Sequence, residues 1–334
     1  MMGPLKKVDD PVNMHIDSEV EEVFNETAGF MINKLKVLAL ACLRGTISSF
    51  DFSCFTNKNT TSSKAQQILA SAFFSKMVKD MEAHFDMTVR QKAVFECLRA
   101  SHALDFLLAI PIDGLGQQMS PVEYRTIPKY RLTIPLFSID AICPICRKAY
   151  LDFFGKHAVH CKELPDFKYR HDMVRDVLFD ICRRAGISVK KEVHVNFLTD
   201  LSDGRSTLRP VDVLAFGWVG GKHACVELTG ASPLVALSGR SFIVGHAALK
   251  VASCKMTKHE KSCIKNQHVF ILFAFETFGF LAPEAVELLN RVQRVMNSNV
   301  MTHRSINVIF CRISFAIQKR LAAQLVARLP STTM

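Results

Sequence analysis

The chain contains one hairpin pattern that strongly restricts its fold. Residues 209–230 read RPVDVLAFGWVGGKHACVELTG, which is two apolar runs on either side of a glycine-rich turn. This pattern is typical of two antiparallel strands joined by a tight reversal. Each run has a single carboxylate near its middle, Asp212 in the first and Glu227 in the second. A sheet built on this hairpin therefore has to accommodate two acids among apolar neighbours.

The spacing of the two acids predicts that they face each other. If the hairpin is symmetric about Val219 and Gly220, Asp212 lies opposite Glu227, with Cβ atoms roughly 4.5–5.5 Å apart. Two carboxylates at that distance repel each other unless a cation or proton lies between them. Because Mg²⁺ takes one or two protein carboxylates and fills its other positions with water and phosphate oxygens, the pair is a candidate Mg²⁺ site. The alternative is that both acids point to solvent from a one-sided sheet, and a one-residue slip would separate them.

A lysine-rich segment follows the hairpin, and its pattern predicts a helix over about residues 246–265. The segment carries a single acid, Glu260, and five lysines: Lys250, Lys255, Lys258, Lys261 and Lys265. A lysine beside a metal-bound phosphate can orient the attacking water or offset charge in the transition state. For each lysine taken alone, the alternative is a solvated helix face.

A short cysteine–histidine stretch, CPICRKAYLDFFGKHAVHC, precedes the hairpin. Its spacing offers Cys143, Cys146, His157 and Cys161, and three thiolates with one imidazole suit a tetrahedral structural Zn²⁺ site. His160 has a spacing that would let it replace His157. A redox-active CxxC is disfavoured because no thioredoxin-like βαβ pattern surrounds it. The stretch therefore predicts a zinc knuckle.

The hydrophobic pattern divides the chain into four regions. We expect a poorly ordered segment (1–62), a helical region with a linker (63–140), the knuckle (141–165) and a larger domain (166–330). From Asp166 onward the predicted order is helix, three strands, helix, strand and helix. This order indicates an α/β (α+β) fold with a mixed central sheet flanked by helices. The final segment, ISFAIQKRLAAQLVAR, is predicted to form a basic amphipathic helix that could track phosphates or be solvated.

The composition favours a basic globular protein. Hydrophobic residues make up 49% of the chain and charged residues 22%, and the formal net charge is +11. The positive charge suits a polyanionic partner, nucleic acid before an anionic membrane surface. The N-terminus lacks the apolar core of a secretory signal, and the apolar run VFILFAF ends at Glu276, too short for a bilayer. We therefore expect an intracellular protein outside the membrane.

The order of these motifs resembles a known arrangement. It consists of a cysteine–histidine knuckle, then YRHDMVRDVL, then a strand with RPVD, a second acid and clustered lysines. The arrangement is similar to the C-terminal end of site-specific non-LTR retrotransposon polyproteins. In those proteins a CCHC knuckle precedes a restriction-endonuclease-like domain of the PD-(D/E)xK superfamily. The segments LGQQMSPVEYRTIPKYRLTIPLF and FAFETFGFLAPEAVELL add to this resemblance, which covers roughly residues 105–300. Uncharacterised plant proteins derived from retroelements are also similar.

The resemblance implies Mg²⁺-dependent cleavage of a DNA phosphodiester. Asp212 and Glu227 match the two acids of the motif, and Lys258, or failing it Lys255, matches a lysine moved onto the following helix. Glu192 is a further possible ligand. The chain departs from the strict motif at Val211, which separates proline from aspartate, and at Thr229, which occupies the usual position of the lysine.

The resemblance also implies contacts with DNA, and hence residence in the nucleus. The residues that it assigns to nucleic-acid binding are Arg170, His171, Lys250, Lys261 and Lys265. No paired-aspartate polymerase motif of the reverse-transcriptase type is present in the sequence, so polymerase activity is not implied. The alternative function is a non-catalytic, zinc-containing nucleic-acid-binding protein. The sequence makes no prediction about oligomeric state.

Overall fold

The chain divides into two compact units, Met1–Met87 and Thr88–Met334. The computed structural model describes residues 62–110, 117–138, 141–161, 163, 166–200, 207–236, 242–299 and 308–329. The segment predicted to be poorly ordered therefore lies outside the described residues, except for Ser62. The described part of the first unit contains helix α2 (Ser62–His84). The other helices and strands of the described residues belong to the second unit.

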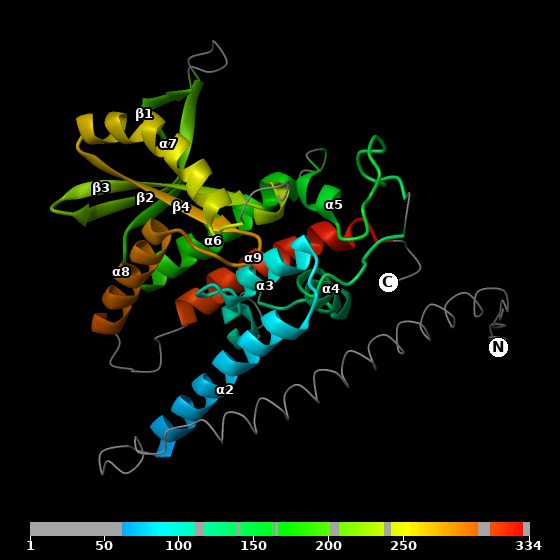
Figure 1. Cartoon of the computed structure of the whole chain (residues 1–334). Helices are drawn as coiled ribbons and strands as arrows, with labels where there is room; N and C mark the ends of the chain where they lie inside the picture. Colours follow the sequence, from blue (N-terminus) through cyan, green and yellow to red (C-terminus); the bar gives the residue numbers. More distant parts are fainter. Residues whose placement is uncertain are drawn as a thin grey trace, which may run out of the picture. The chain divides into compact units, whose positions relative to one another are not determined.

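The second unit is built around a four-stranded mixed sheet (Figure 1). The strands are β1 (Val189–Asp200), β2 (Thr207–Val219), β3 (Lys222–Ala231) and β4 (His268–Glu276). They lie in the order β1-β2-β3-β4; β1, β2 and β3 are antiparallel neighbours, and β4 runs parallel to β3. A parallel neighbour requires a crossover, and α7 (His246–Lys265) supplies it. The predicted α/β class with a mixed sheet is confirmed.

The hairpin reverses one residue later than its symmetric reading assumes. Gly220 and Gly221 form the turn with φ angles of 55° and 79°, values that favour glycine. Next to the turn Val219 pairs with Lys222, whereas farther along Val213 pairs with Val226. Strand β2 contains more residues than β3 between these pairs, so it forms a bulge. The bulge restores the predicted register from Ala215–Ala224 to Val213–Val226, which is one residue short of the two acids.

Helices cover both faces of this sheet (Figure 1). One face packs against α7 through a buried cluster that includes Leu214, Cys225 and Ala252. The other face packs against α6 (Asp166–Arg184), α8 (Pro283–Asn299) and α9 (Val308–Val326). Because neither face is open, the alternative of a one-sided sheet with solvent-facing acids does not apply.

Helix α6 follows directly from its sequence pattern. Val174, Leu178 and Ile181 recur at helical spacing and are fully buried against the sheet. Gly186, with a φ of 79°, follows the end of the helix, where this backbone conformation favours glycine. The bounds predicted for the lysine-rich helix also agree with α7, and no helix in the described residues is long and apolar enough to cross a membrane.

Helix α9 is a correction to the sequence prediction. We expected this helix to be exposed, either as a surface that tracks phosphates or as a solvated face. Most of its residues are buried instead, so both expectations were wrong. Arg312 is 8% exposed and bonds Asp180 of α6 at 2.6 Å, and Arg328, just beyond the helix, is 2% exposed. The helix packs on α6 along one side and on the N-terminal elements along another, which leaves little of its surface to solvent.

A second buried cluster joins the N-terminal elements of this unit to α9. It contains residues of α3 (Val89–Arg99), η2 (Asp105–Leu108), α4 (Pro121–Arg131), the knuckle and α9. Helix α4 starts directly after Ser120, because the Ser120 hydroxyl accepts from Glu123 N–H and the Glu123 carboxylate accepts from Ser120 N–H. The knuckle is therefore packed into the core of the second unit.

Candidate metal centre and acid–lysine site

The four predicted knuckle residues converge in space. The ligand atoms of Cys143, Cys146, His157 and Cys161 all lie within 4.8 Å of one another. Cys143 and Cys161 are buried, and the other two are partly exposed. Within the described residues, no other group of three or more histidines, cysteines or acids comes together in this way. Three sulfurs and one nitrogen at this separation fit the donor set and size of a tetrahedral Zn²⁺ site.

Local backbone geometry positions these ligands. Arg147 has a φ of 52°, and its N–H donates to the Cys143 carbonyl at 2.9 Å, which closes the turn between the first two cysteines. The Asp152 carboxylate accepts from His157 N–H at 2.9 Å at the start of α5 (Lys156–His160). This contact directs His157 towards the cluster, where its Nε2 lies 3.3 Å from Cys146 Sγ.

The structure distinguishes the two candidate histidines. The Nδ1 atom of His160 lies 2.7 Å from the backbone carbonyl of Lys156, a contact within α5. His157, not His160, belongs to the group whose ligand atoms converge. The set read directly from the spacing is therefore the one that the structure assembles.

Two thiols of the cluster, Cys143 and Cys146, have a lowered pKa. Burial raises the pKa of Cys143, but hydrogen bonds from the backbone of Cys146 and Ile145, and from the side chains of Cys146 and Arg328, outweigh it and lower the pKa. Hydrogen bonding from the backbone of Lys148 is the main cause of a lowered pKa at Cys146. Because the thiolate is the form that binds metal, both shifts favour metal binding.

Asp212 lies in a polar contact between β2, β3 and α6. Its Oδ2 accepts from His171 Nε2 at 2.8 Å and from the backbone N–H of Leu228 at 2.6 Å. Its side chain is 15% exposed. Burial lowers the pKa of His171, but hydrogen bonds and charge from Asp212 and Asp172 outweigh it and raise the pKa. Asp212 thus has a hydrogen-bonding partner within the protein, and its contact favours the protonated form of His171.

Glu227 points to α7 and contacts a lysine. Its Oε1 lies 2.7 Å from Lys255 Nζ, and its Oε2 lies 3.9 Å from His259 Nε2. The Glu227 side chain is 14% exposed and that of Lys255 is 25% exposed. Lys255 Nζ also donates to the Leu228 carbonyl at 3.5 Å. Leu228 therefore links the two acids. Its N–H donates to Asp212, and its carbonyl accepts from Lys255, which pairs with Glu227.

The remaining predicted residues have different surroundings. Lys250, Lys261 and Lys265 are exposed on α7, as nucleic-acid binding requires. The side chains of Arg170 and Lys258 lie outside the described residues. His171, predicted to bind nucleic acid, instead contacts Asp212, and Glu192 is bonded by Arg175 Nη1 at 2.5 Å. Of the two candidate lysines, the described contact to an acid belongs to Lys255.

Sequence reasoning missed the carboxylate that anchors α7. Glu276 is fully buried at the end of β4 and accepts from the N–H groups of Gly245 and Ala248, each at 3.3 Å. Burial raises the pKa of Glu276, against the opposing effect of these helix N–H groups. An acid ending an otherwise apolar strand was the signal that could have identified it. Glu276 holds the helix that presents Lys255.

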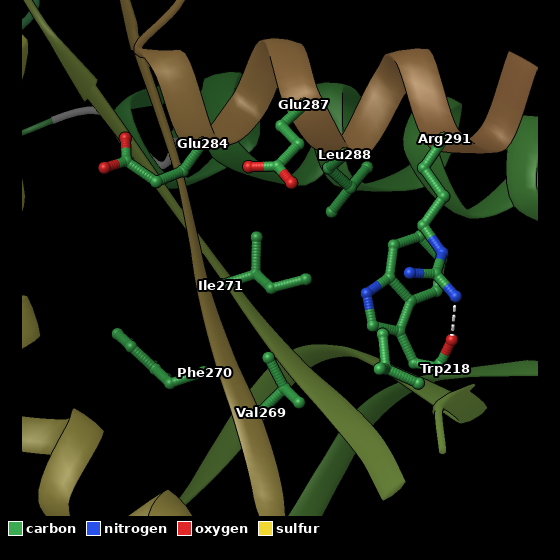
Figure 2. Close-up of a pocket in the computed structure, with 9 residues that line it drawn as sticks. Trp218, Val269, Phe270, Ile271, Glu284, Glu287, Leu288 and Arg291 are labelled. Carbon is green, nitrogen blue, oxygen red and sulfur yellow. Dashed lines mark hydrogen bonds between the residues drawn. The ribbon is translucent and has the colours of Figure 1, made fainter. Parts of the chain in front are cut away.

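A second concave site lies between α8 and the sheet (Figure 2). Arg291 of α8 donates to the Trp218 carbonyl and stacks over its ring, 4.6 Å from the ring centroid. Figure 2 shows Glu284 and Glu287 on the same helix, above Ile271 of β4. Both contacts with Trp218 engage Arg291 within the protein.

No family model, curated protein or solved structure matches this chain. Its function has to be inferred from the chemistry of the metal cluster and of the acid–lysine contact.

Proposed function

We propose that this chain is a retroelement-derived, metal-dependent DNA endonuclease-like protein with a structural Zn²⁺ in its knuckle. The proposal rests on the contact between Glu227 and Lys255. This contact lies one residue from Leu228, whose backbone N–H donates to Asp212. Two acids on neighbouring strands and a lysine from the crossover helix are the residue types that the resemblance to PD-(D/E)xK domains calls for. The Cys143 cluster supports the same resemblance.

In this proposal each residue has a distinct task. Asp212 and Glu227 hold Mg²⁺, which when bound would polarise the phosphate and lower the pKa of a coordinated water. Lys255 places its ammonium group beside the phosphate, where it orients the water and offsets developing charge. Lys250, Lys261 and Lys265 lie on the exposed part of the same helix and contact the DNA backbone. Residence in the nucleus follows from this substrate.

Metal binding would exchange partners at the acids. In the structure, His171 bonds Asp212 and Lys255 bonds Glu227, so each carboxylate already has a counter-charge. Asp212 and Glu227 would hold the metal, and for this the contacts of Asp212 with His171 and of Glu227 with Lys255 would have to loosen.

The same ion pairs favour a second candidate function. Because His171 and Lys255 neutralise both acids without a metal, the arrangement is also consistent with a stable, non-catalytic fold. The protein would then be a zinc-containing nucleic-acid-binding protein that uses its positive charge.

Nicking of supercoiled plasmid in Mg²⁺ or Mn²⁺ tests the proposal. Wild type is expected to nick, and Asp212→Asn, Glu227→Gln and Lys255→Met are each expected to lower the rate at least about 100-fold, as loss of a group that stabilises the transition state does. The control is Lys222→Met, an exposed lysine next to the hairpin turn. If the wild type leaves plasmid intact while it still binds DNA, the second function holds.

A further inference from the structure

Helix α8 carries four charged residues in a fixed order along one face. Glu284, Glu287, Arg291 and Arg294 follow one another at spacings of three, four and three residues, which place them on the same side of a helix. The helix dipole favours an acid in the first turn and a base in the last turn, but only Glu284 lies in a terminal turn. The order of the other three charges therefore has another cause.

The two acids border the small hollow between α8 and the sheet (Figure 2). The hollow has a volume of about 240 Å³, and Val269, Ile271 and Leu288 supply apolar walls. This volume is below the roughly 300–1,000 Å³ of a typical small-molecule pocket. Glu284 and Glu287 are exposed, and neither forms an ion pair with a basic side chain of the described residues. The hollow therefore suits a single cationic side chain.

The arginines of the same helix do not neutralise these acids. Arg294 lies ten residues beyond Glu284, which is about 15 Å along a helix axis and too far for an ion pair. Arg291 is one turn from Glu287, but it donates to the Trp218 carbonyl. Arg294 is exposed, and it forms no ion pair with an acid of the described residues. Helix α8 thus presents acids and a base that need partners from another molecule.

The charge order is complementary to itself. In two antiparallel helices related by a twofold axis, residues equally far from the axis, on opposite sides of it, meet across the interface. Glu284 and Arg294 have the same midpoint as Glu287 and Arg291, at the level of Leu289. One position of the axis therefore opposes each acid to an arginine. This match favours a second copy of the chain over another basic partner.

We propose that this face of α8 is a dimer interface. Arg294 of one copy pairs with Glu284 of the other at the hollow, and Arg291 faces Glu287 nearer the axis. The two copies use the same surface, so the assembly closes as a dimer. The proposal concerns an interface and does not rest on nuclease activity.

Sedimentation velocity of the full chain tests the interface. Wild type is expected to form a dimer that weakens as salt is added, because exposed ion pairs are screened. Arg294→Glu and Glu284→Arg each place like charges opposite each other twice, and each should raise the dimer dissociation constant at least about 10-fold. Lys92→Glu changes the charge at an exposed residue of α3 and should leave the constant unchanged. A wild type that stays monomeric at low salt overturns the proposal.

A mixture of the two variants separates ion pairing from misfolding. In a heterodimer of Arg294→Glu with Glu284→Arg, both contacts again join a glutamate to an arginine. The equimolar mixture should therefore recover the dimer that each variant alone has lost. Circular dichroism and zinc content check that each variant folds, and folded variants that do not recover the dimer contradict the proposal. If one does not fold, Glu284→Gln and Arg294→Gln replace the pair, and dissociation constants equal to that of wild type overturn the proposal.

An oligo-arginine peptide tests the other possible occupant of the hollow. The peptide should compete with the second copy and dissociate the wild-type dimer, because it offers the same guanidinium group to the acids. Peptide binding to a wild type that is monomeric would instead assign the hollow to a different basic partner and overturn the proposal.

Discussion

The metal cluster and the acid–lysine site differ in how they are assembled. All four ligands of the cluster come from a short continuous stretch, Cys143 to Cys161. The acid–lysine site draws residues from α6, β2, β3 and α7, beginning with His171 and ending with His259. Local spacing is enough to bring together the first set, because a tight turn and one short helix fix it. The second set depends on sheet register and on helix packing.

The two sites also differ in charge. The cluster gathers three cysteines, and the pKa of two of them, Cys143 and Cys146, is lowered, which favours the thiolate. At the acid–lysine site each carboxylate already contacts a basic side chain, His171 or Lys255. We therefore expect a bound cation to matter more for the stability of the first site than for that of the second. The following predictions test this difference.

Removal of zinc is expected to have the largest effect. Structural zinc contributes about 10–16 kcal/mol in finger peptides, comparable with the whole stability of a domain. Cys143→Ser should abolish stoichiometric zinc binding and lower the unfolding midpoint of the sheet as well, because α9 belongs to both buried clusters. Trp218, the only tryptophan in the sequence, lies in the sheet and reports its unfolding by fluorescence. An unchanged Trp218 transition would show that the knuckle folds independently.

Breaking the Glu227–Lys255 pair is expected to cost less. Glu227→Gln and Lys255→Met should each lower the free energy of unfolding by about 1–3 kcal/mol, because a partly buried charge loses its partner. The double variant should lose less than the sum of the single variants if the two groups interact. Urea unfolding of all four proteins measures the coupling. Additive losses would mean that the contact contributes nothing to stability.

The anchoring carboxylate gives a pH-dependent effect. Burial raises the pKa of Glu276 above 4.5, so between that value and the raised pKa the folded protein retains a proton that the unfolded chain has lost. This contribution makes wild-type stability fall as pH rises through that window. Glu276→Gln removes this titrating group. The free energy of unfolding of the variant, relative to that of wild type, should therefore rise with pH within the window and stay level above the raised pKa. Urea unfolding at several pH values measures this, with exposed Glu284→Gln as control; parallel wild-type and Glu276→Gln curves would refute it.

The exposed lysines of α7 should give the smallest effect. Lys261→Ala is expected to weaken DNA binding modestly and to reduce the slope of log affinity against log salt by about one. Zinc content and the unfolding midpoint should stay the same, because the residue is exposed. Fluorescence anisotropy over a range of salt concentrations provides the measurement. A salt slope equal to that of wild type would remove Lys261 from the interface.

The sequence by itself determined the elements and the metal cluster. Helical spacing of Val174, Leu178 and Ile181 predicted α6, and alternating apolar runs predicted the hairpin. The ligand spacing from Cys143 to Cys161 predicted the converging set. These features depend on residues close in sequence, so periodicity and spacing are sufficient.

Only the tertiary structure decided which charges are buried and which partners they have. The bulge in β2 adjusts the hairpin register, and the contact to Glu227 comes from Lys255, where the sequence favoured Lys258. Glu276 and Arg328 are ordinary charges in the sequence, yet both are buried. Burial results from packing between segments distant in the chain, and no local pattern records which charged group will meet which partner across a core.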